Sequence, residues 1–103
     1  MKDNKPLEIE IELEFTSKVK ALGCMCFKLE IKGRKGATDR LVVIPGGKVL
    51  FIEFKRPGKL HNTSPHQIVF MRELRNINHE ALVTDSYKQA LEKVIKILTA
   101  TDL

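Results

Sequence analysis

A glutamate and a lysine stand two residues apart at the end of an apolar stretch, where Glu53-Phe54-Lys55 follows Val49–Ile52. Side chains two apart on a strand share a face, so we expect Glu53 and Lys55 to point the same way. Charged groups at the end of a buried strand cost free energy to desolvate unless something uses them. Asp39 opens the preceding apolar stretch and offers a second carboxylate.

This residue set suits the hydrolysis of phosphodiester bonds. Two carboxylates can hold a hard divalent cation such as Mg²⁺, which prefers oxygen ligands. Such a cation polarises the scissile phosphate and acidifies a bound water, while a lysine offsets charge in the transition state. A lone E-x-K tripeptide also occurs at ordinary solvated strand ends, so Glu53 and Lys55 by themselves leave that alternative open.

The chain order expected around these residues is α-β-β-β-α-β-α, and the strand–helix–strand unit predicts a parallel pair in a mixed sheet flanked by helices. The elements are a helix over 6–22, strands over 24–31, 40–44 and 48–55, a helix from Ser64 and Pro65, a strand over 81–84 and a helix from Ser86. The fold class is therefore α/β.

The first segment is ambiguous, because its apolar residues fit two periods. Leu7, Ile9, Ile11, Leu13 and Phe15 alternate as in a strand, whereas Leu7, Ile11, Phe15, Val19 and Leu22 form a helical stripe. The helical stripe is longer and ends at Gly23, a good residue just past a helix, so we favour a helix. Two apolar residues, Ile9 and Leu13, are then left over from the stripe.

The turn between the two central strands decides whether Asp39 can share a face with Glu53. A two-residue turn at Gly46-Gly47 would pair Asp39 with Phe54 and send it to the wrong face. A three-residue turn at Pro45–Gly47, or a bulge, would place Asp39 opposite Glu53. We predict one of these two arrangements.

The two later helices each have an expected cap and an expected inward face. Ser64 is an N-cap with Pro65 in the first turn, and Ser86 with Gln89 is typical of a capping box. The inward sets are Ile68, Met71, Leu74 and Ile77 in the first of them, and Ala90, Leu91, Val94, Ile95 and Leu98 in the second.

Composition indicates one domain over residues 1–103 with a mild basic excess, a net charge of +5 and a pI of about 9.4. Acidic residues gather at 8–14 and basic ones at 28–59, which fits a nucleic-acid partner. No apolar run approaches the roughly 18 residues of a membrane span, and the N-terminus is no signal peptide, so we expect a cytoplasmic protein. Cys24 and Cys26 are expected to be reduced thiols, and the histidines ordinary surface residues.

Motifs in order along the chain resemble the VRR-NUC family of the PD-(D/E)xK nuclease superfamily, over about residues 8 to 95. They are Glu8 ahead of Gly23, the basic-glycine segment from Arg34 to Asp39 and Arg40, the Pro45-Gly46-Gly47 hairpin, Glu53-Phe54-Lys55 with Arg56-Pro57-Gly58, and Ser64-Pro65-His66-Gln67. Thr38 stands where the family usually has proline, a residue that shapes the loop and is not a metal ligand.

The resemblance implies a restriction-endonuclease-like core and a Mg²⁺-dependent nuclease, with Mn²⁺ able to substitute. It makes Asp39, Glu53 and the carbonyl of Phe54 the metal ligands and Lys55 the catalytic lysine. Glu8 and Gln67 would be supporting active-site residues. Glu12 lies one helical turn from Glu8 and remains its rival.

The expected substrate is DNA, with phosphate contacts from Arg34, Lys35, Arg40, Arg56 and Lys59. Three readings remain open: a Holliday-junction-resolvase-like endonuclease on branched DNA, a nuclease with a nicking or end-processing role, and a non-catalytic nucleic-acid-binding module. Resolving a junction needs two symmetric cuts, so the first reading predicts a homodimer, as the resemblance to stand-alone phage-type members also implies. The leftover Ile9 and Leu13 are a possible partner surface, with partial burial inside the monomer as the alternative.

Overall fold

The computed structural model describes residues 7–34 and 40–100. The elements are α1 (Glu8–Ala21), β1 (Met25–Lys28), β2 (Arg40–Ile44), β3 (Lys48–Phe54), a 3₁₀ turn (Leu60–Asn62), α2 (Pro65–Asn76), β4 (Glu80–Thr84) and α3 (Tyr87–Thr99). The predicted order α-β-β-β-α-β-α is confirmed, with the 3₁₀ turn added in the segment expected to be a loop.

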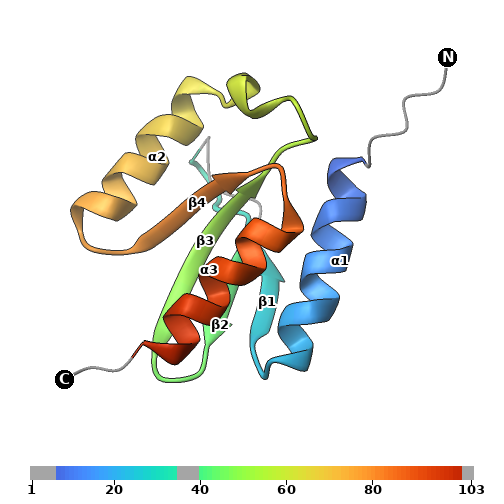
Figure 1. Ribbon diagram of the computed structural model, residues 1–103. Coiled ribbons are helices and arrows are strands. Elements are labelled where there is room, and N and C mark those ends of the chain that lie inside the picture. Colours follow the sequence, from blue (N-terminus) through green and yellow to red (C-terminus); the bar gives the residue numbers. More distant parts are fainter. Residues whose placement is uncertain (1–6, 35–39, 101–103) are drawn as a thin grey trace, which may run out of the picture.

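In the part of the chain that the structure describes, four strands form one sheet in the order β1-β2-β3-β4. β1 pairs with β2 and β2 with β3 in antiparallel, whereas β3 pairs with β4 in parallel across the α2 crossover. Helices α1 and α3 lie together over one face, and α2 lies over the other (Figure 1). The chain is therefore an α/β protein with a mixed sheet flanked by helices, as predicted.

Alternation along β3 divides the core between the two faces. Leu50, Ile52 and Phe54 are buried against α1 and α3, where the ring centroids of Phe54 and Phe15 lie 5.2 Å apart. Phe51 points the opposite way and meets Phe70 of α2 edge to face at 6.3 Å. Because Glu53 is an odd-numbered position like Phe51, its side chain belongs to the α2 face.

The β2–β3 hairpin has a three-residue connection, one of the two arrangements predicted for the turn at Pro45–Gly47. Pairing runs from Arg40 opposite Ile52 to Ile44 opposite Lys48, which leaves Pro45, Gly46 and Gly47 in the turn. Both glycines have positive φ, 97° and 79°, which side chains with a Cβ rarely adopt. The predicted turn is confirmed. Asp39 itself lies outside the described residues.

The first segment is a helix, and its central apolar residues Ile11, Phe15 and Val19 are buried as expected. The stripe is shorter than predicted, since Leu7 and Leu22 flank the helix ends and are exposed. Ile9 and Leu13 are also exposed, on the side of α1 turned away from the core. Strand β1 is shorter than predicted too, ending at Lys28 instead of Ile31.

The inward faces of α2 and α3 need correction. Ile68 and Ile77 are exposed, and the buried set of α2 is Phe70, Met71 and Leu74. Ile77 is the C-cap residue, beyond the helical rotation that the prediction assumed.

In α3 the buried positions are Ala90, Val94 and Ile97, spaced by four and three residues, with Leu91 and Leu98 partly buried beside them. Ile95 is exposed because it lies about 100° around the helix from Val94.

Both expected N-caps form, in different ways. Ser64 Oγ accepts from the Gln67 N–H at 3.2 Å and the Gln67 side chain accepts from the Ser64 N–H at 3.1 Å, a closed capping box. Ser86 Oγ accepts from the Gln89 N–H at 3.2 Å, but the Gln89 amide bonds to the Thr84 hydroxyl instead of closing the box. Among the described residues, none of the helices is both long and apolar enough to cross a bilayer.

Candidate active site

Glu53 is a buried carboxylate on the α2 face, near the carboxyl end of β3, with 2% of its surface exposed. Lys55 follows one residue past the end of β3, where its N–H donates to the Thr84 carbonyl at 2.8 Å. That bond continues the pairing with β4, which keeps Lys55 on the same face as Glu53. The side chain of Lys55 is 13% exposed, so both charged groups are largely removed from water.

Gln67, in the first turn of α2, joins these two side chains into a triangle. Its Nε2 donates to Glu53 Oε1 at 2.5 Å, and its Oε1 accepts from Lys55 Nζ at 3.1 Å. Lys55 Nζ lies 3.3 Å from the same Glu53 oxygen. The triangle fixes the directions of the carboxylate and the ammonium, because each is held by a different end of one amide.

The position of Gln67 follows from how α2 begins. The Ser64–Gln67 capping box and Pro65 at the first helical position set the start of the helix beside the end of β3. The first turn of α2 thus brings the Gln67 amide to the carboxylate of Glu53. The residues that start α2 therefore also place Gln67 next to Glu53 and Lys55.

The arrangement combines oxygen ligands with a positive charge next to them. A carboxylate that is buried, oriented and paired with an ammonium can take part in ionic chemistry that a solvated strand end would not support. Within residues 7–34 and 40–100 there is no cluster of three or more His, Cys, Asp or Glu side chains placed to hold a metal. The second carboxylate of the prediction, Asp39, is outside those ranges.

Comparison with known proteins identifies the family. A solved structure described as a VRR_NUC domain superposes with a TM-score of 0.72 at 34% identity, over 86% of this chain and 94% of that chain. The chain is a member of the VRR-NUC family. It is also 37% identical over 79 residues, 77% of this chain and 83% of the relative, to the candidate nuclease p44 of Acyrthosiphon pisum secondary endosymbiont phage 1. No family model matches the sequence.

The two rival glutamates of the VRR-NUC helix α1 have different surroundings. Glu12 is buried and accepts from Arg40 Nε at 2.9 Å, whereas Glu8 is half-buried in the first turn. Arg40 pairs with Ile52 in the sheet, and Ile52 faces α1 and α3. The Glu12–Arg40 pair therefore lies on the face opposite Glu53, and the proposed role of Glu8 remains a prediction.

The predicted DNA contacts of this VRR-NUC chain are dispersed. Arg34 donates to Glu73 Oε2 at 2.8 Å and stacks over the Phe70 ring, 4.9 Å from its centroid. Arg40 forms an ion pair with Glu12, as described above. Arg56 is half-buried and Lys59 exposed, both in the loop that follows Lys55, and Lys35 lies outside the described residues.

That loop is fixed to the end of the neighbouring parallel strand, because the Gly58 N–H donates to Asp85 Oδ2 at 3.3 Å. Arg56 and Lys59 are thus held at the same edge of the sheet as Glu53 and Lys55. Of the basic residues predicted to contact DNA and described here, these two lie nearest in sequence to the buried triangle.

The two cysteines of the VRR-NUC chain are free, as expected. Burial raises the pKa of both thiols above the usual value, with Cys26 further raising that of Cys24. Thr16 hydroxyl contacts Cys26 Sγ at 3.8 Å on the α1 side. A raised pKa leaves little thiolate at neutral pH, which disfavours a nucleophilic or metal-binding role for either cysteine.

Proposed function

We propose that this VRR-NUC protein is a metal-dependent nuclease that hydrolyses phosphodiester bonds of DNA at Glu53 and Lys55. The observation that carries the proposal is the buried triangle of Glu53, Lys55 and Gln67, in which one amide orients both charged groups. The names of both relatives, a VRR_NUC domain and a candidate phage nuclease, support the same class of activity.

The donor set fits a hard divalent cation. Glu53 offers a carboxylate and Phe54 a backbone carbonyl, and both are oxygen donors of the kind that Mg²⁺ and Mn²⁺ accept. Asp39 is the expected second carboxylate, and the observed register of β2 and β3 is the one under which it was predicted to face Glu53. A cation bound there would supply positive charge to the scissile phosphate and acidify a water.

The protein's own groups have separate tasks in this proposal. Gln67 orients the Glu53 carboxylate through its Nε2 and the Lys55 ammonium through its Oε1. Lys55 offsets negative charge that develops on the phosphate, an effect that is stronger in a site with little water. Glu8 is proposed to support the site from α1, and Arg56 and Lys59 to contact neighbouring phosphates.

Branched DNA and a homodimer are the finer part of the proposal. A junction resolvase must make two cuts, which a C₂ dimer provides. The exposed apolar residues Ile9 and Leu13 on α1 offer it a surface. The other readings, a nuclease with a nicking or end-processing role and a non-catalytic DNA-binding module, are outcomes of the same experiment.

The experiment is a cleavage assay on duplex, flap and four-way-junction DNA of equal length, with Mg²⁺, Mn²⁺ or excess chelator. We expect cleavage with either metal, none in chelator, and a preference for the junction. Asp39→Asn should abolish cleavage, because it removes an anionic ligand without changing shape. Light scattering on the same samples should give the mass of a dimer.

Full-rate cleavage in chelator would contradict the metal site, and binding without cleavage in every metal would favour the non-catalytic module. A monomer with no junction preference would favour the nicking or end-processing role.

A further inference from the structure

Asp85 is a carboxylate at the end of the sheet where Glu53 and Lys55 lie, and it takes no part in the proposed cleavage. Asp85 directly follows β4 as Lys55 directly follows β3, and the two strands are parallel, so the chain leaves both at one end of the sheet (Figure 1). Asp85 Oδ2 accepts from the Gly58 N–H at 3.3 Å. This hydrogen bond ties the segment that follows Lys55 to the corner between β4 and α3.

The corner that carries Asp85 is held on both sides. Thr84 is fully buried, and its hydroxyl oxygen accepts from the Ser86 N–H at 3.1 Å. Ser86 in turn caps α3 by accepting from the Gln89 N–H at 3.2 Å. Asp85 stands between Thr84 and Ser86, so its backbone has little freedom and its half-buried side chain starts from a fixed position.

The partner of Asp85 is a tight turn with a basic residue at each end. The Lys59 N–H donates to the Arg56 carbonyl at 2.9 Å, and Gly58 has a φ of 83°. With Pro57 before that glycine, this is a type II turn. The Gly58 N–H takes no part in the turn's own hydrogen bond, and Asp85 accepts it instead. The position in which Asp85 holds the turn therefore decides where the Arg56 and Lys59 side chains begin.

Position and charge make opposite predictions for Asp85. A carboxylate beside a DNA-binding segment repels phosphate, so its charge alone weakens DNA binding. By contrast, an acceptor that fixes the turn in advance reduces the entropy lost when Lys59 orders against a phosphate, which strengthens DNA binding. The sign of the change in DNA affinity when Asp85 is removed therefore separates the two effects.

We propose that Asp85 is a positioning residue for DNA: it holds the Arg56–Lys59 turn so that Lys59 contacts the phosphate backbone beside the buried triangle. The inference rests on the proposed nuclease function, which makes Lys59 a phosphate contact. Asp85 acts through the turn, so loss of its hydrogen bond should weaken DNA binding even though a negative charge is removed.

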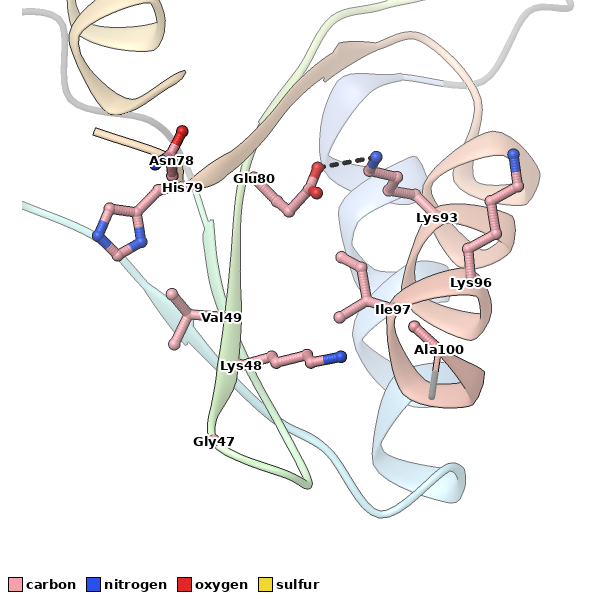
Figure 2. A pocket seen from close by; sticks show the side chains of 10 residues that line it. All are labelled: Gly47, Lys48, Val49, Asn78, His79, Glu80, Lys93, Lys96, Ile97 and Ala100. Atoms are coloured by element: carbon pink, nitrogen blue, oxygen red, sulfur yellow. Dashed lines mark ion pairs between the residues drawn. The ribbon is translucent and has the colours of Figure 1, made fainter. Parts of the chain in front are cut away.

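Two substitutions separate the hydrogen bond from the charge. Asp85→Ala removes both, whereas Asp85→Asn removes the charge and keeps an oxygen that can accept from the Gly58 N–H. Glu80→Ala is the matched control, because Glu80 lies at the other end of β4, five positions or roughly 17 Å of strand away. Its carboxylate contacts Lys93 of α3 at 2.8 Å (Figure 2), so this variant also loses one charge and one contact.

Fluorescence anisotropy without divalent metal measures binding of each variant to a labelled duplex across a salt series, and thermal melting verifies folding. We expect Asp85→Ala to bind about threefold more weakly, with a salt slope smaller by about 0.9, the value for one lost phosphate contact. Asp85→Asn and Glu80→Ala should bind at least as tightly as wild type. Amide hydrogen exchange at Gly58 should become faster in Asp85→Ala alone.

Lys59→Ala provides a second background for the same substitution. In it, Asp85→Ala should cause no further loss of affinity, because the phosphate contact that Asp85 positions is already gone. An additive loss in the double variant would place the effect of Asp85 elsewhere and contradict the proposal.

Three other results would overturn the inference: unchanged or tighter binding by Asp85→Ala, an equal loss in Asp85→Asn, or an equal loss in Glu80→Ala. The first would mean that charge outweighs position, the second that the hydrogen bond is not what matters, and the third that the loss is not specific to this end of β4. If the expected pattern appears in a protein that cuts no DNA in any metal, the nuclease proposal fails and the inference stands. If the wild-type protein cuts DNA and Asp85→Ala binds it normally, the inference alone fails.

Discussion

Two buried ion pairs occupy opposite faces of the same sheet, and their chemistry differs although their composition is similar. Glu53, near the end of β3, and Lys55, one residue past that end, are two residues apart, with 3.3 Å between their charged atoms. Glu12 and Arg40 are 28 residues apart and join α1 to the start of β2, 2.9 Å between charged atoms. Glu53 is 2% exposed and Glu12 7%.

The difference separates an ion pair that stabilises the fold from an ion pair that is expected to act on a substrate. Removing one partner of Glu12–Arg40 leaves an uncompensated charge between two packed elements, so that pair holds the fold together. The contact between Glu53 and Lys55 does not by itself join two elements, because their spacing along the chain already places them side by side. Their link to α2 is made by Gln67. A buried pair that joins no distant segments by its own contact, and that is oriented by a third group from another element, is the one expected to be used on a substrate.

The largest effect is expected from Lys55→Ala. Cleavage should fall by about 10² to 10³-fold, the usual cost of losing one group that stabilises charge in the transition state. DNA affinity should stay within about threefold of wild type, because most phosphate contacts come from other residues. Single-turnover cleavage and anisotropy measure the two quantities separately.

Lys59→Ala is the control for that variant, since Lys59 is exposed on the adjoining loop and carries the same charge. It should weaken binding slightly and leave the saturated cleavage rate unchanged. If Lys55→Ala cleaves DNA at the wild-type rate, the Glu53–Lys55 pair is structural, and the distinction between the two ion pairs is wrong.

The second effect concerns stability. Glu12→Gln should destabilise the protein by about 3 to 5 kcal/mol, the range for breaking a buried ion pair by removing one partner. The double variant Glu12→Leu/Arg40→Met should recover most of that loss, because an apolar pair of similar volume leaves no buried charge. Urea denaturation measures both. A loss below about 1 kcal/mol for Glu12→Gln would show that this pair behaves as a surface pair.

Sequence patterns located the Glu53 pair but missed the Glu12 pair. The E-x-K spacing and the strand period place Glu53 and Lys55 on one face without knowledge of any other element. Glu12 is one of four alternating glutamates, and only its position next to Ile11 and one turn before Phe15 could have suggested burial. Its partner is 28 residues away, and no local period contains that information.

The side of a helix that packs against the sheet is also hard to predict from local sequence patterns. The start of α2 followed from Ser64, Pro65 and Gln67, because capping is local chemistry. Which side of α2 packs was predicted less well, since Ile68 and Ile77 are exposed and Phe70 is buried. Phe70 is the α2 residue whose ring packs against Phe51 of β3. Which residue of α2 makes this contact depends on how the helix lies across the sheet.

The smallest effect should come from a third ion pair, Arg34–Glu73, in which the side chains are 39% and 54% exposed. Glu73→Gln should cost at most about 1 kcal/mol in urea denaturation, because water and salt screen an exposed pair. It also releases Arg34, so DNA affinity should be unchanged or rise by less than about threefold if Arg34 is a phosphate contact. A loss above about 2 kcal/mol would place this pair with Glu12–Arg40 as a structural link. Weaker DNA binding by Glu73→Gln in a fully folded protein would mean that Glu73 holds Arg34 in its binding position, so that the ion pair and the phosphate contact act together.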